Sequence, residues 1–526
     1  MIQPAPTCES GTTNRPWWET RPFVALLILI SAVPLIYPPI PPLVDLLGHM
    51  GRYRVELDLA TSPWLKDYYG FHWAAIGNLG VDLLVIPLAK IFGLELAVKL
   101  IVLTIPPMTV AGFLWVAREV HGRIPPTALF ALPFAYSHPF MYGFVNFALS
   151  IALAFLAFGL WLRLARLHRL RLRAILFVPI SLIVFFTHTF GWGVLGLLCF
   201  SGEAVRQHDS GKGWFRSGVN AALHASVMAL PLLFMLSWRS SIHGGITGHW
   251  FDFNLKWHFF LASLRDRLKW FDVGAVTVTI LVMIESLRRR ELTFSRNLVF
   301  SALVLFAGFI LLPYLVFSSA YADMRMIPYA IAVLLLAIRF RGETQRPLAD
   351  VIAVLGLVFF LARIAGNTAS LGIAARDQEA KLQALDRVPM GARVLSLVHT
   401  GCGNAWSLPR NTHLGAMTIV RRHGFSNDQW VTPGLNLLSL HYREARPFNS
   451  DPSQIVRIPR CTGRIYWNSV TALRAIPPGR FDYLWLIDFP PLDPRLTQGM
   501  QPVWRGGDST LYRLPPIQPA AQPPAD

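Results

Sequence analysis

Long apolar runs separated by short polar loops recur through the first 365 residues of this chain, for example at 23–37, 299–316 and 351–361. A helix needs about 20 mostly apolar residues to cross a hydrocarbon layer roughly 30 Å thick. Only 15% of the residues are charged, against about 25% in a typical soluble domain. The pattern therefore predicts an α-helical polytopic membrane protein.

Basic residues are concentrated in short loops between the apolar runs, and such loops stay on the cytoplasmic side of a membrane. The net charge of +18 is therefore interpreted as a topology signal, not as a nucleic-acid surface. The five basic loops are 118–123, 163–173, 206–216, 288–296 and 339–346. Placing all five inside predicts about eleven transmembrane helices, near 23–38, 97–117, 124–137, 144–162, 174–187, 189–205, 218–237, 272–287, 297–317, 326–338 and 348–365.

This topology divides the chain into a cytoplasmic tail (1–22), a transmembrane domain (23–366) with large outer loops at 39–96 and 239–271, and an outer, periplasmic domain (367–515). We expect a multi-pass protein of a bacterial inner (plasma) membrane. The apolar segment 72–93 would reverse two basic loops if it spanned, and it contains Asn78 and Asp82, which are costly at bilayer depth. We therefore predict interfacial or re-entrant helices over 64–93, with a true span as the alternative.

Residues 367–515 change character: proline and glycine separate short strand-like runs at 393–398, 483–487 and 509–514. Residues 503–514 read as a hairpin that turns at Gly506-Gly507-Asp508. The segment 364–385 is expected to continue the last membrane helix. These features predict a soluble C-terminal α/β domain, followed by a proline-rich disordered tail at 516–526.

Two of the four cysteines, Cys402 and Cys461, fall in this outer domain. An oxidising compartment favours a disulfide between them. A metal site is the alternative, although neither cysteine belongs to a CxxC spacing.

The first outer loop carries an acid just beyond the first span. Four prolines stiffen the approach to Asp45, and on a helix Asp45, His49 and Arg52 would share one face. A carboxylate beside an imidazole at the membrane surface acts as a general base or helps to hold a divalent cation such as Mg²⁺ or Mn²⁺. The other interpretation is a carboxylate at a helix N-terminus with a neighbouring histidine.

Further polar residues are predicted on the same side of the membrane. His138, Tyr142 and Asn146 lie in the second outer loop, HPFMYGFVN, and His188 lies at the tip of a helical hairpin. Arg325 precedes a later span, where its guanidinium matches a lipid phosphate. A local pair with Asp323 or a snorkelling arginine are the other interpretations of Arg325.

The layout resembles the GT-C superfamily of membrane glycosyltransferases, which includes protein O-mannosyltransferases and aminoarabinose transferases. The matching features are the loop acid Asp45, the interfacial stretch 72–93, the second loop HPFMYGFVN and Arg325. Family members often carry two adjacent acids in the first loop and another in the second. Here Asp45 stands alone and the second loop offers Asn146, so the resemblance leaves the need for a metal open.

The resemblance implies an inverting hexosyltransferase that uses a polyprenyl-phosphate-linked sugar and a lipid, glycan or protein acceptor. Asp45 would deprotonate the acceptor hydroxyl, Arg325 with His188 would hold the departing phosphate, and the C-terminal domain would help to bind the acceptor. A lipid or polysaccharide transporter and a non-catalytic envelope scaffold are the alternatives.

Overall fold

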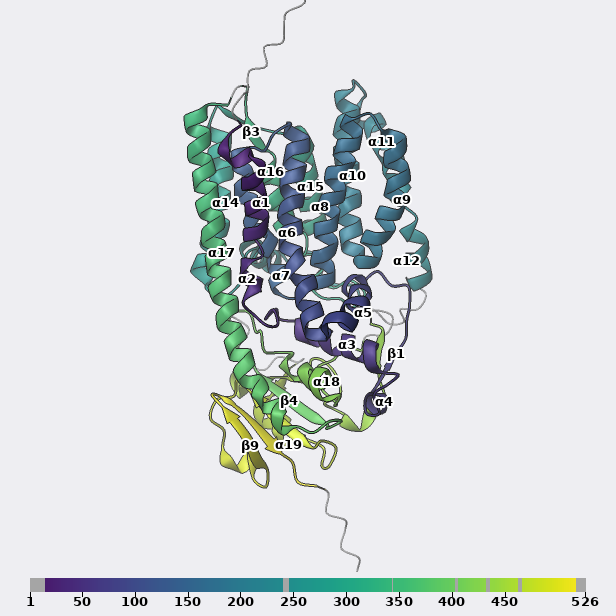
Figure 1. Cartoon of the computed structure of the whole chain (residues 1–526), viewed down its shortest axis with the longest axis vertical. Helices are drawn as coiled ribbons and strands as arrows, with labels where there is room; N and C mark the ends of the chain where they lie inside the picture. The colour runs from purple at the N-terminus through teal and green to yellow at the C-terminus, as the bar shows by residue number, and fades with distance from the viewer. Residues whose placement is uncertain are drawn as a thin grey trace, which may run out of the picture.

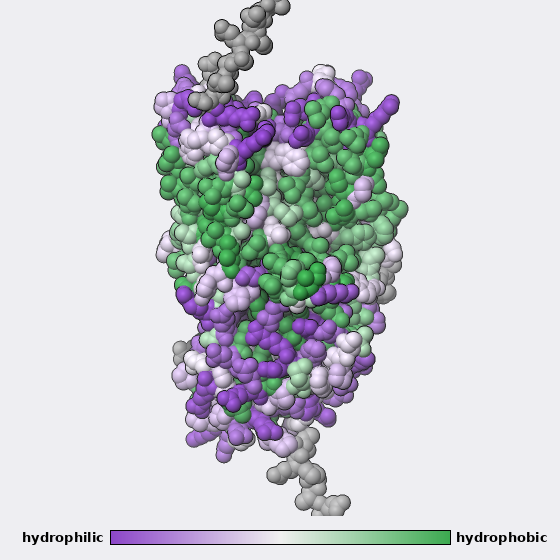
Figure 2. All heavy atoms as spheres, viewed as in Figure 1, coloured by the Kyte–Doolittle hydropathy of each residue, from purple (hydrophilic) through white to green (hydrophobic). Residues whose placement is uncertain are grey.

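The computed structural model describes residues 15–239, 246–342, 344–402, 405–431, 436–461 and 466–516. A bundle of helices forms one end of the molecule and a smaller domain with a β-sheet forms the other (Figure 1). On the face seen in Figure 2, apolar side chains form a band over the helices, with hydrophilic side chains above it and over the smaller domain. This surface is that of a helical membrane protein with a soluble C-terminal domain. The predicted disordered tail lies outside the described residues except for its first position.

Five described helices are long and apolar enough to cross a membrane: α6 (Leu94–His121), α8 (Val145–Arg166), α9 (Leu170–Thr187), α14 (Lys269–Arg288) and α17 (Arg346–Leu382). Helices α11 (Trp214–Ala225) and α12 (Pro231–Arg239) belong to a bent pair that would make a sixth span. The predicted count of eleven is not confirmed for the described residues.

The remaining predicted spans correspond to elements that are too short or too polar to count as membrane-crossing helices by length and composition. They are α1 (Arg21–Ile30), α2 (Val33–Ile36), η2 (Pro126–Tyr136), α10 (Thr189–Asp209), α15 (Arg296–Leu311) and α16 (Ile327–Leu336). Among them η2 is a 3-10 helix with a proline inside it, at Pro133, and all of its residues are buried. Helix α10 carries charged residues, including Glu203, towards its C-terminus.

All five basic loops lie at one end of the bundle, as the charge pattern predicts. Strands β2 (Leu292–Phe294) and β3 (Ile338–Phe340) join two of these loops as an antiparallel pair. Polar contacts link the others: Arg123 donates to Thr344, Arg166 pairs with Glu119, and Arg296 pairs with Asp209. The sheet domain occupies the opposite end (Figure 1). The basic loops and the C-terminal domain are therefore on opposite ends of the molecule.

The ambiguous segment 72–93 contains one helix, α5 (Gly80–Phe92), of 13 residues. At 1.5 Å per residue this helix is about 20 Å long, too short to cross the hydrocarbon layer. Gly93, with φ of 75°, then reverses the chain into α6. The rest of the first outer loop forms α3 (Leu46–Asp58), α4 (Leu65–Tyr68) and β1 (Tyr69–Phe71). Short helices therefore cover this end of the bundle, in agreement with the interfacial interpretation.

The C-terminal domain contains a six-stranded sheet of order β7-β6-β4-β8-β10-β9. Its strands are β4 (Val394–His399), β6 (Ile455–Arg457), β7 (Trp467–Asn468), β8 (Tyr483–Ile487), β9 (Gln501–Gly506) and β10 (Ser509–Arg513). The first four run parallel, and β9 and β10 form the predicted hairpin, with Gly507 at a φ of 58°. Helix α17 runs without a break past the predicted domain boundary at residue 367. This agrees with the prediction that the segment 364–385 continues the last membrane helix.

The domain is fastened to the membrane-proximal loops. Strand β5 (Leu438–Leu440) pairs with β1 of the first outer loop, and α18 (Met417–Arg422) packs on α3. The other short helices of the described chain are α7 (His138–Met141), α13 (Phe253–Leu261), α19 (Ser469–Arg474), η1 (Trp17–Glu19), η3 (Ser226–Met228), η4 (Gln383–Arg387), η5 (Leu414–Ala416), η6 (Arg443–Ala445), η7 (Pro459–Cys461) and η8 (Pro494–Thr497). The first outer loop and the C-terminal domain thus form one packed unit.

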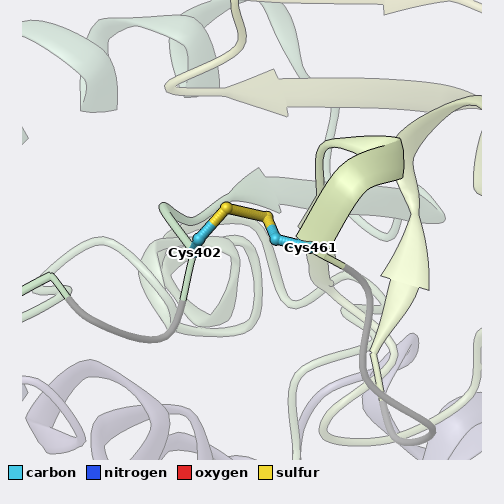
Figure 3. The surroundings of a disulfide bond; sticks show 2 residues. All are labelled: Cys402 and Cys461. Atoms are coloured by element: carbon cyan, nitrogen blue, oxygen red, sulfur yellow. A yellow bond between two sulfur atoms is a disulfide. The ribbon is translucent and has the colours of Figure 1, made fainter.

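Cys402 and Cys461 form a disulfide, with 5.4 Å between their Cα atoms (Figure 3). This confirms the predicted pairing, and the alternative of a metal site at these two thiols is wrong. The bond joins the loop after β4 to η7 of the same domain.

Candidate functional site

A cavity of about 1530 Å³ lies where the membrane helices meet the C-terminal domain. Its wall includes all seven predicted substrate-site residues: Asp45, His49, His138, Tyr142, Asn146, His188 and Arg325. Residues separated by up to 280 positions in the sequence therefore come together in one space. Cys402 of the disulfide also lines it.

Asp45 is the residue immediately before α3, and its backbone is held by the second outer loop. Its N–H donates to the carbonyl oxygen of Tyr142 at 2.9 Å. Gly143, which follows Tyr142, has a φ of 97°, and a Cβ at this position would lie 2.6 Å from the backbone nitrogen of Asp45. A side chain at position 143 would therefore displace the acid. Direct contact between the two outer loops fixes the position of Asp45.

The C-terminal domain places an imidazole against this acid. Nε2 of His413 lies 3.8 Å from Oδ1 of Asp45 and 3.8 Å from Oδ1 of Asp451. Nδ1 of His413 lies 3.1 Å from the carbonyl oxygen of Asp428. A carbonyl only accepts, so Nδ1 carries a hydrogen, and in the neutral ring Nε2 presents its lone pair to the two carboxylates. The site is therefore an Asp–His–Asp cluster.

The pKa of Asp45 is raised to about 7. Burial of the side chain is the main cause; His413 and Arg325 lower the pKa and Asp451 raises it. The side chain keeps 14% of its surface exposed. A carboxyl group that changes charge near neutral pH suits a general base, because it both accepts a proton and later releases it.

His49 lines the same cavity as Asp45, and its predicted part in catalysis stays a prediction. Its ring packs between Tyr53 and Trp430, with ring centroids 6.4 and 5.0 Å away. Burial lowers its pKa well below the usual value, with further lowering by Arg52 and His413. The imidazole is therefore neutral at physiological pH and acts as part of an aromatic stack.

The sequence also predicts that Asp45 and His49 hold a divalent cation. Among the described residues no three His, Cys, Asp or Glu side chains group together so as to hold a metal ion. Arg52, expected on the same helix face as Asp45 and His49, pairs with Asp82 at 2.8 Å. A divalent cation at Asp45 and His49 therefore stays a prediction.

The polar residues Asn78 and Asp82 in the segment 72–93 both accept hydrogen bonds from Asn146. Oδ1 of Asn146 accepts from the N–H of Val81 at 2.6 Å, and Nδ2 donates to Asn78 and Asp82. Asn146 thus secures the start of α5 and, through Asp82, the buried Arg52. Its side chain is already engaged by the protein, so its predicted contact with substrate stays a prediction.

Arg325 lies just before α16 and is 6% exposed. Its guanidinium lies over the rings of Phe144, Phe147 and Phe190, at 4.7, 5.7 and 5.0 Å from their centroids. Nε has no hydrogen-bond partner among the described residues. Burial lowers its pKa to about 10, with Asp45 opposing the shift, so it is charged at neutral pH.

The alternative of an Asp323–Arg325 pair is wrong. Asp323 instead pairs with Nζ of Lys256 at 2.9 Å. His188 lies in the same wall as Arg325, and its Nδ1 accepts from the N–H of Phe190 at 3.1 Å. In the neutral ring the hydrogen is therefore on Nε2. Arg325 and His188 are both donors suited to an anion.

Besides Tyr142, two tyrosines that the sequence did not single out, Tyr314 and Tyr321, line the cavity. Tyr142 and Tyr321 join their hydroxyls at 3.2 Å, and the rings of Tyr314 and Tyr321 lie 5.1 Å apart. His138 packs edge-on against Tyr142, and neither of its ring nitrogens has a partner among the described residues. These groups line the cavity with hydrogen-bonding aromatic surface, which stacks well on a sugar ring.

Towards the membrane helices the cavity becomes apolar. The residues there belong to α10, α12 and α15, and are Trp192, Val194, Leu197, Met235, Gly308 and Leu311. The same cavity therefore contains an apolar part between helices, the buried guanidinium of Arg325, and the Asp45–His413–Asp451 cluster where the first outer loop meets the C-terminal domain.

No protein-family model and no curated protein sequence matches this chain. Among solved structures, ArnT from Cupriavidus metallidurans in the apo state is similar at 12% identity and a TM-score of 0.46, over 93% of this chain and 96% of that one. ArnT from the same organism bound to undecaprenyl phosphate is similar at 11% identity and a TM-score of 0.47, over 93% and 97%.

Proposed function

We propose that this protein is an inverting membrane glycosyltransferase. It moves a sugar from a polyprenyl-phosphate-linked donor to an envelope acceptor on the outer face of a bacterial inner membrane. The observation that carries the proposal is the single cavity in which an apolar part, the buried Arg325 and the Asp45–His413–Asp451 cluster follow one another.

The apolar part suits a polyprenyl chain, which has no hydrogen-bonding groups and gains free energy by leaving water. Arg325 suits the phosphate. A guanidinium that lacks a carboxylate partner keeps its donors for a ligand, and its contact with two phosphate oxygens is charge-assisted. Nε2–H of His188 supplies a further donor. The tyrosines near Asp45 would then pack against the sugar.

Asp45 is the proposed general base. Its carboxylate takes the proton of the acceptor hydroxyl while that oxygen attacks the anomeric carbon from the face opposite the phosphate. The new carbon–oxygen bond forms as the bond to the phosphate oxygen breaks, and polyprenyl phosphate leaves with its charge compensated by Arg325. The proton on Asp45 passes to Nε2 of His413, which restores the base.

A matched pair of substitutions tests the proposal. We expect Asp45→Asn, expressed at normal level in the native host, to lower transfer roughly 100-fold or more, because the amide cannot accept the proton. Asp67→Asn makes the same charge change at an exposed position of the same loop and should leave transfer unchanged. Mass spectrometry of envelope lipids and glycans is the measurement. An unchanged glycan profile in Asp45→Asn cells would refute the enzyme and favour a transporter or scaffold.

The lipid is tested separately by mass spectrometry of lipids that co-purify with the protein. Polyprenyl phosphate or its glycosylated form should be enriched with the wild type and depleted with Arg325→Ala. Equal recovery from both proteins would contradict the role of Arg325.

A further inference from the structure

A second cavity, of about 230 Å³, opens within the C-terminal domain at the carboxyl ends of β4 and β8. The chain leaves β4 towards β6 on one side, and later returns to place β8 on the other side of β4. The connections after these two neighbouring parallel strands therefore diverge. In open sheets this arrangement creates a crevice, and ligands bind there. His399 and Thr400 at the end of β4 and Asp488 after β8 line it.

Two carboxylates are held rigidly at this crevice. Nζ of Lys381 lies 2.5 Å from Oδ1 of Asp377 and 2.7 Å from Oδ1 of Asp488. Nδ2 of Asn411 donates to the other oxygen of each, at 2.9 Å in both cases. Each ionised carboxylate has about four lone-pair sites, so both still accept hydrogen bonds from a ligand. Lys381 compensates much of their charge.

Polar atoms without protein partners also lie in the crevice wall. Oγ1 of Thr400 and Nε2 of His399 are buried atoms that have no hydrogen-bond partner among the described residues. Leaving such groups unpaired costs free energy. The crevice also shares part of its wall with the large cavity: Thr400, Gly401, Ala405, Ser407, Pro409 and Thr412 line both.

We propose that this crevice binds a carbohydrate residue of the acceptor, a role that rests on the proposed function. A sugar presents several hydroxyls that donate to Asp377 and Asp488 and accept from Thr400. The two carboxylates disfavour an anion, and the polar wall disfavours an acyl chain. Through the shared wall, the acceptor extends from the crevice towards Asp45.

The test is saturation-transfer NMR on the full-length protein in nanodiscs, with methyl glycosides of glucose, galactose, mannose and N-acetylglucosamine as probes. At least one glycoside should give a signal with the wild type. Thr400→Val should lower its affinity about tenfold, because one ligand hydrogen bond is lost. The same change should leave thermal stability intact, since the hydroxyl has no partner in the protein. Ala374→Leu, which fills a wall of the crevice only, should abolish the signal.

Two controls separate this inference from the proposed reaction. The Asp508→Asn protein should bind the glycoside normally, because Asp508 does not line the crevice. It is a matched control, since Asp508 also lies near Lys381, at 3.7 Å. Asp45→Asn should also bind the glycoside, so a failure of the transfer reaction leaves this result unaffected. The inference is overturned if no glycoside binds the wild type, if Ala374→Leu binds normally, or if undecaprenyl phosphate displaces the glycoside.

Discussion

Arg325 and Arg363 are both buried arginines, 6% and 2% exposed, and both lie over aromatic rings. Arg363 pairs with the carboxylate of Asp272 at 2.8 Å and donates to the carbonyl oxygen of Leu264. Arg325 has aromatic neighbours but no ion pair within 4.0 Å among the described residues. A buried charge that the fold neutralises belongs to the scaffold, whereas one left without a counter-ion is a candidate for binding an anion.

The largest effect expected from this comparison concerns stability. Arg363→Ala should destabilise the protein by about 3–5 kcal/mol, because it leaves the buried Asp272 without its counter-ion. Arg325→Ala should leave stability unchanged or raise it, because no partner is abandoned. Thermal unfolding in the same detergent compares the two variants directly. Similar losses of stability in both would remove the distinction.

The next effect concerns affinity. Arg325→Ala should weaken binding of undecaprenyl phosphate by roughly 10- to 100-fold, the value of one charge-assisted interaction of about 1.5–3 kcal/mol. Arg325→Lys should recover part of this loss, since the charge returns without the two-pronged geometry. Isothermal titration or native mass spectrometry gives the affinities. Wild-type affinity in Arg325→Ala would show that the cation serves the fold after all.

The smallest effect is a pH dependence. The pKa of Asp45 is about 7 in the folded protein and about 3.8 when exposed, so the folded state retains a proton that the unfolded state releases. The stabilisation by this proton is complete below the lower value and is lost as the pH rises through about 7. Unfolding temperatures between pH 5 and 8 should therefore fall more steeply for the wild type than for Asp45→Asn. Parallel curves would contradict the raised pKa.

Transfer activity should show the opposite trend with pH. It should rise as the pH passes through about 7, because the carboxylate is the form that accepts the proton. Initial rates measured across pH 5.5–8.5 with saturating donor test this expectation. A rate that is flat over this range would assign the base to another group.

The sequence predicted those parts of the site that depend on local pattern and membrane position. Asp45 and Arg325 could be found because each is a polar residue at a predicted boundary between a span and the outer side. The hairpin could be found from its short turn. The disulfide could be found because both cysteines fall in the domain predicted to lie in an oxidising compartment, although they are 59 residues apart.

The other half of the site depends on contacts across the chain, and no local signal marks them. His413 reaches Asp45 only because the C-terminal domain packs on α3, and nothing in the residues around His413 indicates that packing. The same limit explains why the partner of Arg52 was not predicted: Asp82 is brought close by the short helix α5. The number of spans is not confirmed, because hydropathy does not separate a membrane-crossing helix from a buried 3-10 helix with an internal proline such as η2.

The unbroken helix α17 acts as a spacer that sets both the height and the angular setting of the two halves of the cavity. Each residue of an α-helix adds about 1.5 Å of rise and about 100° of rotation. A single inserted residue where α17 leaves the membrane region would therefore turn the sheet domain away from the first outer loop. His413 would lose Asp45 without any change in either side chain, so the length of this helix is as much a part of the site as the residues that line it.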